Sequence, residues 1–153
     1  MIEQQPTVIV ALGASNTAGY GIAPELAFPA VLQSLLQARG FAVRMLNAGI
    51  PGHTTAQMLA RLERDVPRET RLMLFQPGSN DDRIGVPYGV RAANIRTITD
   101  QLTARGVKVL RVAAAFDAAR PGNLQPDGVH YTVAGHDLIA RLLVDQVVAV
   151  LSS

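Results

Sequence analysis

Residues 8–17 read Val-Ile-Val-Ala-Leu-Gly-Ala-Ser-Asn-Thr, an apolar run that stops at a glycine and a small polar turn. A continuous apolar run of this length is typical of a strand buried on both faces of a parallel sheet. Ser15 follows the run directly, and open α/β sheets place their sites beyond the carboxyl ends of the strands. The stretch therefore predicts an α/β fold. It makes Ser15 either a nucleophile or part of an ordinary strand-to-helix turn.

The composition predicts a single domain over residues 1–153. The chain is 48% hydrophobic and 17% charged, which suits one sizeable core. Its net charge is +2, and the thirteen arginines and one lysine are scattered, so nucleic-acid binding is not expected. The absence of cysteine excludes disulfides, thiolate catalysis and cysteine metal sites.

The sequence shows no targeting or membrane segment. Residues 1–6 lack a basic region and lead straight into the first apolar run. No apolar run approaches the length that a membrane-spanning helix needs. We therefore expect a soluble cytoplasmic protein that does not bind membranes.

Strand-length apolar runs alternate with segments of helical period along the chain. Strands are predicted near residues 7–12, 41–46, 72–76 and 107–114. Helices are predicted from Pro29 to Gly40, from the capping box that starts at Thr54, from Tyr88 to Arg105, and from Thr132 onward. The apolar face of the last helix is expected to comprise Ile139, Leu142, Leu143, Val147 and Val150. This alternation predicts a parallel sheet of four to five strands with helices on both faces.

The loops that follow the predicted strands carry the unusual residues. They span residues 13–21, 47–52 and 77–82, and all three lie at the same edge of a parallel sheet. After the fourth strand, an irregular segment with Pro121 and Pro126 leads to Asp127-Gly128-Val129-His130. We expect that segment to fold back to the same edge.

These loops contain the groups that acyl transfer needs. Asp127 and His130 are three residues apart, so the carboxylate can orient an imidazole that takes a proton from Ser15. The amides of Ser15 and Gly49 and the side chain of Asn80 are candidate donors to an oxyanion. Each also has a structural interpretation: Asp127 and Asn80 as turn or capping residues, and Gly49 as a turn glycine.

The four segments resemble the SGNH hydrolases, also called GDSL esterases and lipases. The resemblance is carried, in order, by residues 13–17, by residues 47–49 with Gly52, by residues 78–81, and by the turn from Asp127 to His130. It implies a flavodoxin-like three-layer α/β/α sandwich. It also implies that Ser15 is the nucleophile, His130 the base oriented by Asp127, and Ser15, Gly49 and Asn80 the oxyanion donors.

Two features depart from the family pattern. Ala14 stands where an aspartate usually precedes the nucleophile, and the chain is short between the fourth strand and Asp127. The short segment, residues 115–126, is mostly small or polar. It therefore predicts a shallow, open acyl site that favours acetyl to butyryl esters.

Other chemistries fit the sequence poorly. Residues 13–21 lack the endings of a phosphate loop or dinucleotide site, and Gly-x-Ser-x-Thr lacks the last glycine of a nucleophile elbow. The three histidines, His53, His130 and His136, lack metal-ligand spacing, so we predict no metal and no cofactor. His53 is expected to cap or face solvent and His136 to lie at the surface or pack. Residues 81–83 are expected to form a solvated loop network.

The sequence therefore predicts a serine ester hydrolase that acts on a small ester. Sugar O-deacetylation or acyl transfer is a second enzymatic reading. A catalytically silent carbohydrate- or lipid-binding module on the same scaffold is an alternative that Ala14 keeps open. Homo-oligomerisation is compatible with the sequence and is not determined by it.

Overall fold

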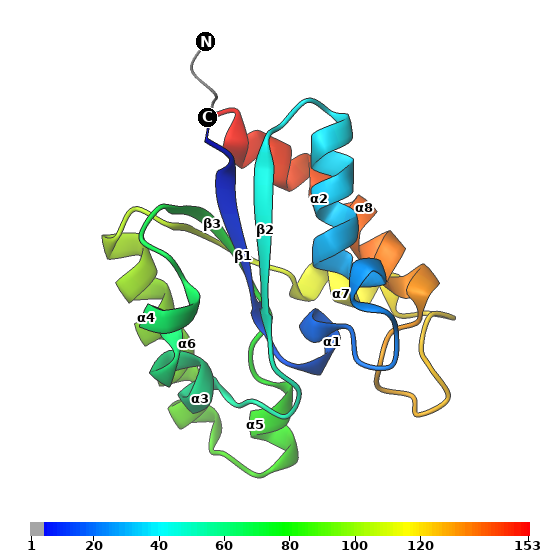
Figure 1. Ribbon diagram of the computed structural model, residues 1–153. Coiled ribbons are helices and arrows are strands. Elements are labelled where there is room, and N and C mark those ends of the chain that lie inside the picture. Colours follow the sequence, from blue (N-terminus) through cyan, green and yellow to red (C-terminus); the bar gives the residue numbers. More distant parts are fainter. Residues whose placement is uncertain (1–4) are drawn as a thin grey trace.

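The computed structural model describes residues 5–153 and contains one sheet of four parallel strands (Figure 1). The strands are β1 Thr7–Gly13, β2 Val43–Gly49, β3 Thr70–Phe75 and β4 Lys108–Arg111, in the order β2-β1-β3-β4. The α/β fold predicted from the sequence is confirmed. Residues 1–4, part of the segment in which no targeting signal was found, lie outside the described residues.

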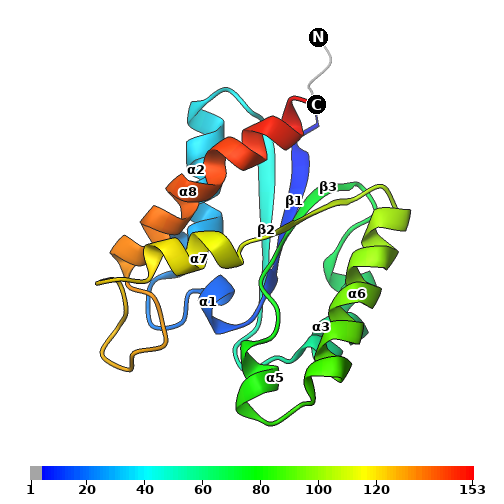
Figure 2. The ribbon, with the colours of Figure 1, turned by 180° about the vertical axis from the view of Figure 1, so that it is seen from behind.

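Helices cover both faces of this sheet, as Figures 1 and 2 show. One layer contains α2 Phe28–Ala38, α7 Ala113–Ala119 and α8 Val133–Leu151. The other contains α3 Thr55–Ala60, α4 Leu62–Asp65 and α6 Tyr88–Ala104. The short elements α1 Ser15–Ala18, η1 Pro24–Leu26 and α5 Ser79–Arg83 belong to the connections. No helix within residues 5–153 is long and apolar enough to span a membrane.

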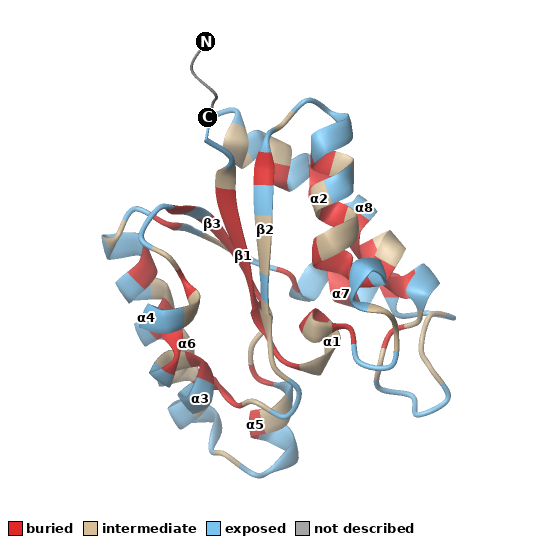
Figure 3. Ribbon diagram, in the orientation of Figure 1, coloured by how far each residue is buried: buried red, intermediate tan, exposed pale blue. Residues whose placement is uncertain are grey.

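The central strand β1 packs against both helical layers. Ile9 and Ala11 belong to the apolar cluster that includes α2 and α8. Val8, Val10 and Leu12 point the other way, into the cluster with α3, α4 and α6. Ile9, Val10, Ala11 and Leu12 are completely buried, which explains why the sequence of this strand is continuously apolar (Figure 3).

Most helix boundaries agree with their sequence signals. Thr54 forms the predicted capping box, in which its side chain accepts from the Gln57 amide and the Gln57 side chain accepts from the Thr54 amide. Gly40 and Gly106 follow α2 and α6 with φ of +90° and +80°, the left-handed conformation that glycine adopts without strain. Local sequence thus determines where these helices begin and end.

The structure corrects one predicted strand end and one predicted core residue. The fourth strand ends at Arg111, whereas the prediction extended it to residue 114. Ala113–Ala119 instead forms helix α7, since alanine is the best helix former and Phe116 and Ala119, one turn apart, both enter the core. In α8, Leu142 was expected on the apolar face but is 39% exposed.

His136 is a packing residue, one of the two outcomes expected for it, and it is completely buried. Its Nδ1 accepts a hydrogen bond of 3.0 Å from the amide of Phe28, the first residue of α2. Burial lowers the pKa of His136 from 6.5 to about 4. The neutral imidazole therefore joins the start of α2 to α8.

This buried imidazole predicts a loss of stability in mild acid. The folded-state pKa lies below the unfolded value, so the unfolded chain binds the extra proton between pH 6.5 and about pH 4. We expect the unfolding free energy to fall by roughly 3 kcal/mol across this window. Urea unfolding of the wild type and His136→Gln at several pH values measures the effect. An equal pH dependence in both proteins would contradict it.

Candidate active site

The candidate site lies beyond the carboxyl ends of β1 and β3. The chain leaves β1 towards β2 on one side and returns to β3 on the other, so the strand order reverses between β1 and β3. Open α/β sheets bind ligands at such a switch point because the diverging loops leave a crevice. Ser15 is the first residue of α1 after β1, and Asn80 lies in α5 after β3.

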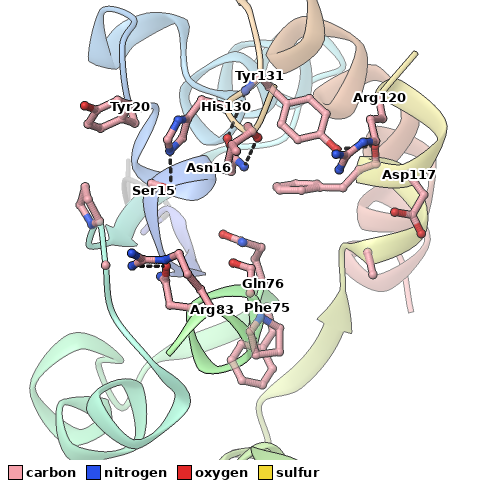
Figure 4. Close-up of a pocket in the computed structure, with 18 of the residues that line it drawn as sticks. Ser15, Asn16, Tyr20, Phe75, Gln76, Arg83, Asp117, Arg120, His130 and Tyr131 are labelled. Carbon is pink, nitrogen blue, oxygen red and sulfur yellow. Dashed lines mark hydrogen bonds between the residues drawn. The ribbon is translucent and has the colours of Figure 1, made fainter. Parts of the chain in front are cut away.

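Ser15, His130 and Asp127 form a continuous hydrogen-bonded chain, in the arrangement expected from the sequence. Figure 4 shows the contact between His130 and Ser15. His130 Nε2 lies 3.0 Å from Ser15 Oγ, and His130 Nδ1 lies 2.5 Å from Asp127 Oδ2. With Nδ1 donating to the carboxylate, Nε2 is free to accept the serine proton. The fold thus brings together residues 115 positions apart.

The Asp127 carboxylate is held in its ionised form. Its Oδ1 accepts from the amides of Val129 and His130 at 2.9 and 3.0 Å. The side-chain hydrogen bond from His130, followed by these two amides, lowers the pKa of Asp127 to about 2. Asp127 is therefore charged at neutral pH and fixes both the turn and the imidazole.

Two residues of the first loop hold the histidine segment in place, and the sequence reasoning missed both. The ring of Tyr20 lies against that of His130, with centroids 4.3 Å apart. Asn16 donates to the Val129 carbonyl at 3.1 Å and accepts from the Tyr131 amide at 3.2 Å. The only feature of the sequence that points to a role for Asn16 and Tyr20 is that they lie one and five residues after Ser15.

The candidate oxyanion donors Asn80 and Gly49 differ in the hydrogen bonds that they already make. Asn80 Nδ2 donates to the His53 carbonyl at 2.9 Å, and its Oδ1 accepts from Arg83 at 3.1 Å, so the amide orientation is defined. The Gly49 amide instead donates to Asn47 Oδ1 at 2.9 Å, and a side chain at Gly49 would collide with the backbone of Ala18. Gly49 therefore serves close packing of β2 against α1.

Gly52 lies three residues after Gly49, which ends β2, and its surroundings differ. It lines the same cavity as Ser15 and Asn80, whereas Gly49 does not. Its φ is +83°, and within the described residues its amide donates no hydrogen bond to the protein. Both glycines belong to the second sequence segment that resembles the family. Only the tertiary structure shows which of the two faces the cavity with a free amide.

Buried Arg61 ties the ends of the first two strands together. Its guanidinium donates to the carbonyls of Gly13 and Ala48 at 3.0 and 2.8 Å, and it pairs with Asp65 at 2.7 Å. Its Nε donates to His53 Nδ1 at 3.1 Å. Burial, followed by the Arg61 charge, lowers the pKa of His53, which keeps that ring neutral and able to accept. Arg61 thus supports both the Ser15 loop and the backbone that holds Asn80.

Ala14, the departure from the family pattern, is buried beneath the serine. Its amide donates to Gln76 Oε1 at 3.2 Å, and the same oxygen accepts from Thr17 at 2.8 Å. Gln76, directly after β3, therefore holds the turn that contains Ser15 by accepting hydrogen bonds from the residues on either side of it. In this chain the Gln76 side chain binds the turn at the position where the family pattern has an aspartate and this chain has Ala14.

Asp81 does not belong to the solvated network expected for residues 81–83, whereas Asp82 and Arg83 are exposed. Asp81 is buried, and its carboxylate accepts from the amide and hydroxyl of Thr55 at 2.9 and 2.6 Å. Asp82 is exposed and pairs with Arg91. Asp81 therefore anchors α5, and with it Asn80, to the start of α3.

A cavity of about 680 Å³ opens beside Ser15 and His130. Phe75, Phe116 and Tyr131 contribute aromatic surface to its wall, and Arg83, Arg111 and Arg120 contribute positive charge. Phe116 and Asp117 come from α7, which the sequence analysis did not predict. Helix α7 therefore supplies part of the cavity wall.

Residues 11–127 match the sequence profile of the GDSL-like lipase/acylhydrolase family. An arylesterase of Vibrio mimicus is 32% identical over 103 residues, which cover 67% of this chain and 52% of that protein. Esterase TesA of Pseudomonas aeruginosa is 31% identical over 103 residues, which cover 67% of this chain and 51% of that protein. The chain thus spans about half the length of these curated relatives.

Solved structures share the fold. The crystal structure of TesA superposes with a TM-score of 0.86 at 22% identity, covering 94% of this chain and 99% of that one. The psychrotrophic esterase EstA from Pseudoalteromonas sp., inhibited by monoethylphosphonate, gives a TM-score of 0.82 at 19% identity, covering 96% and 100%. Both likenesses extend over nearly the whole chain.

Proposed function

Because the chain belongs to the GDSL-like lipase/acylhydrolase family, we propose that it hydrolyses carboxylic esters through an acyl-enzyme on Ser15. The observation that carries the proposal is the hydrogen-bonded chain from Asp127 through His130 to Ser15 at the cavity wall. Such a chain activates a hydroxyl that is otherwise a weak nucleophile. The names of the related arylesterase and esterase TesA support the same reaction class.

The reaction proceeds in two steps. His130 Nε2 takes the proton of Ser15 as Oγ attacks the ester carbonyl, and it returns that proton to the departing alcohol when the carbon–oxygen bond breaks. Water, deprotonated by the same nitrogen, then attacks the acyl-enzyme and releases the acid and Ser15. Asp127 stabilises the imidazolium that forms in each step.

The oxyanion of each tetrahedral intermediate needs donors on one side of Ser15. We assign the amides of Ser15 and Gly52 and the Nδ2 of Asn80 to this role. Gly52 replaces Gly49 in the assignment because the Gly49 amide is already bonded to Asn47 and lies off the cavity. Donors fixed in advance stabilise the developing charge without reorganisation during the reaction.

Asn80→Ala tests this donor set. We expect turnover to fall by roughly a hundredfold to a thousandfold while KM changes little, because the oxyanion exists only in the transition state and intermediates. Steady-state kinetics on nitrophenyl acetate separate kcat from KM. Gln101→Ala, which removes an exposed amide from α6 outside the cavity, is the control. A change confined to KM would assign Asn80 to substrate binding instead.

We propose short-chain acyl and aryl esters as substrates. Each buried methylene contributes only about 0.8 kcal/mol, and only where the wall is apolar. The aromatic wall of the cavity is interrupted by Asp117, Arg111 and Arg120. A long acyl chain would have to pass these charges, so it gains little from added length.

This argument predicts a peak in kcat/KM at two to four acyl carbons. Rates on nitrophenyl esters from two to sixteen carbons measure the profile below the critical micelle concentration of each substrate. We expect a monotonic fall beyond butyrate. A peak at twelve or more carbons would contradict the proposed acyl class while leaving the hydrolytic mechanism in place.

Covalent labelling tests the activity directly. A fluorophosphonate reacts with an activated serine, and EstA has been solved in a form inhibited by a phosphonate. We expect one adduct, located by mass spectrometry on the peptide that contains Ser15. A silent binding module on this scaffold would give no adduct at Ser15 and no ester hydrolysis.

A further inference from the structure

The cavity beside Ser15 carries more positive than negative charge. Arg83, Arg111 and Arg120 line it, and the carboxylates that line it are Asp117 and Asp127. Asp127 is already engaged by His130 and by two backbone amides. Asp117 is therefore the one lining carboxylate that is not committed to the catalytic chain.

The three cavity arginines form no ion pair within the described residues, and among the other ten arginines five form one and five do not. Five arginines pair with aspartates within 4.0 Å: Arg39, Arg61, Arg64, Arg91 and Arg141. Across residues 5–153, no ion pair includes Arg83, Arg111 or Arg120. Asp117 and Arg120 are three residues apart and line the same cavity, yet they do not pair. Arg83 donates to Asn80 Oδ1, and Arg120 lies against the Tyr131 hydroxyl. No carboxylate of the described part of the chain pairs with Arg111 or Arg120, so these two charges are available to an anionic ligand.

Arg111 and Arg120 lie at the α7 end of the cavity. Arg111 ends β4, and its guanidinium carbon lies 5.7 Å from the centroid of the Phe75 ring. Arg120 directly follows α7. Figure 4 shows Arg120 and Asp117 across the cavity from Tyr20 and Ser15. Arg120 therefore lies some distance from the reacting carbonyl, and Arg111, at the other end of α7, is a second cation that lines the same cavity.

Aromatic surface lies between the serine and these cations. Phe116 and Tyr131 both line the cavity, and their ring centroids are 5.2 Å apart. The Tyr131 hydroxyl donates to the Phe116 carbonyl at 2.8 Å, so its polar end is satisfied within the protein. An apolar or aromatic part of a bound substrate would cover this surface. A charged group attached beyond that part would reach the guanidinium groups.

We propose that the preferred substrate is an ester that also carries an oxyacid anion, a carboxylate or phosphate, which Arg111 and Arg120 bind at the α7 end of the cavity. Guanidinium groups match such anions because two parallel N–H groups meet two oxygens. A cleft lined by one sign of charge also concentrates ligands of the opposite sign. This inference rests on the proposed ester hydrolysis and names its substrate class.

Matched ester pairs test the proposal and locate the anion. The acyl-side pair is the nitrophenyl monoester of glutaric acid against nitrophenyl pentanoate. The leaving-group pair is acetoxybenzoate against its methyl ester. In each pair the ratio of kcat/KM for the anionic over the neutral ester is divided by the ratio of their hydroxide-catalysed rates. We expect a corrected ratio above one for at least one pair, and that pair identifies the side of the ester that faces α7.

The arginine variants test which residues produce this ratio. In Arg111→Gln/Arg120→Gln we expect the ratio for that pair to fall by about tenfold, the sum of two modest, partly exposed charge interactions. Raising the salt concentration should lower the wild-type ratio as well, since it screens exposed charges. Arg68→Gln, an exposed arginine outside the cavity, is the matched control and should keep the wild-type ratio.

The outcomes separate this inference from the proposed function. Corrected ratios at or below one in both pairs would overturn the anion site while hydrolysis of the neutral esters upheld the esterase. A ratio above one that survives in the folded double variant would also overturn it. Absence of hydrolysis of all four esters by the folded wild type would instead overturn the proposed function. Using ratios removes any general effect of a substitution on turnover.

Discussion

Replacing Ser15 with alanine is expected to lower kcat/KM for nitrophenyl acetate by at least about 10⁴-fold. The substitution removes the attacking Oγ and leaves the oxyanion donors and the cavity in place. Residual hydrolysis then depends on water attacking the bound ester. Water is not held in position, so it lacks the effective concentration of a fixed nucleophile. No other serine can substitute, because only Ser15 lies 3.0 Å from His130 Nε2.

The experiment uses Ser15→Ala beside Ser34→Ala. Ser34 lies exposed on α2, where its hydroxyl donates to the Ala30 carbonyl, so its loss removes a serine without touching the site. We expect wild-type activity and labelling in Ser34→Ala, and neither in Ser15→Ala. Urea unfolding should show that both variants remain folded. Hydrolysis by Ser15→Ala within tenfold of the wild-type rate would rule out the acyl-enzyme.

Asp127→Asn is expected to lower kcat by roughly a thousandfold to ten-thousandfold. The asparagine Oδ1 can still accept from the amides of Val129 and His130, so the turn should persist. Its NH₂ group, however, would donate to His130 Nδ1 and force the proton onto Nε2. The imidazole then presents a donor to Ser15 and cannot take its proton.

The control for this variant is Asp137→Asn. Asp137 also pairs with a basic residue of its own segment, Arg141, four positions further along α8, and it does not line the cavity. We expect it to retain wild-type kcat. Because the pKa of Asp127 is about 2, its carboxylate stays ionised from neutral pH to well below pH 4, and its titration should not limit activity there. Wild-type kcat in Asp127→Asn would remove Asp127 from the mechanism.

The fold accounts for how so short a chain assembles a complete site. Each functional segment follows a different strand or precedes α8, and the parallel sheet aligns their ends at one edge. Buried Arg61 and Asp81 then fix these segments to one another through backbone carbonyls, an amide and a hydroxyl. Charged groups that are fully hydrogen-bonded in this way are costly to disturb, because removing one leaves its partners unsatisfied in a buried environment.

The sequence by itself determined the order of the four strands and of the longer helices, and it placed most of the candidate site residues at one edge of the sheet. The continuous apolar run of β1 requires burial on both faces, and caps and glycines mark the helix ends, so these features follow from local chemistry. Ser15, Asn80, Asp127 and His130 were identified because each occupies a polar loop at one sheet edge. These inferences need only periodicity and chain order.

Only the tertiary structure distinguishes Gly49 from Gly52 as a candidate donor, because an amide is available to a ligand only where no protein group, here the Asn47 side chain, already accepts from it. The same holds for Asp81 and His136, whose burial results from packing against Thr55 and Phe28. It also holds for α7, since the short apolar run Val112–Phe116 suits a strand or a helix until its neighbours are known. Pairwise contacts between residues far apart in the chain carry this information, and no local pattern encodes them.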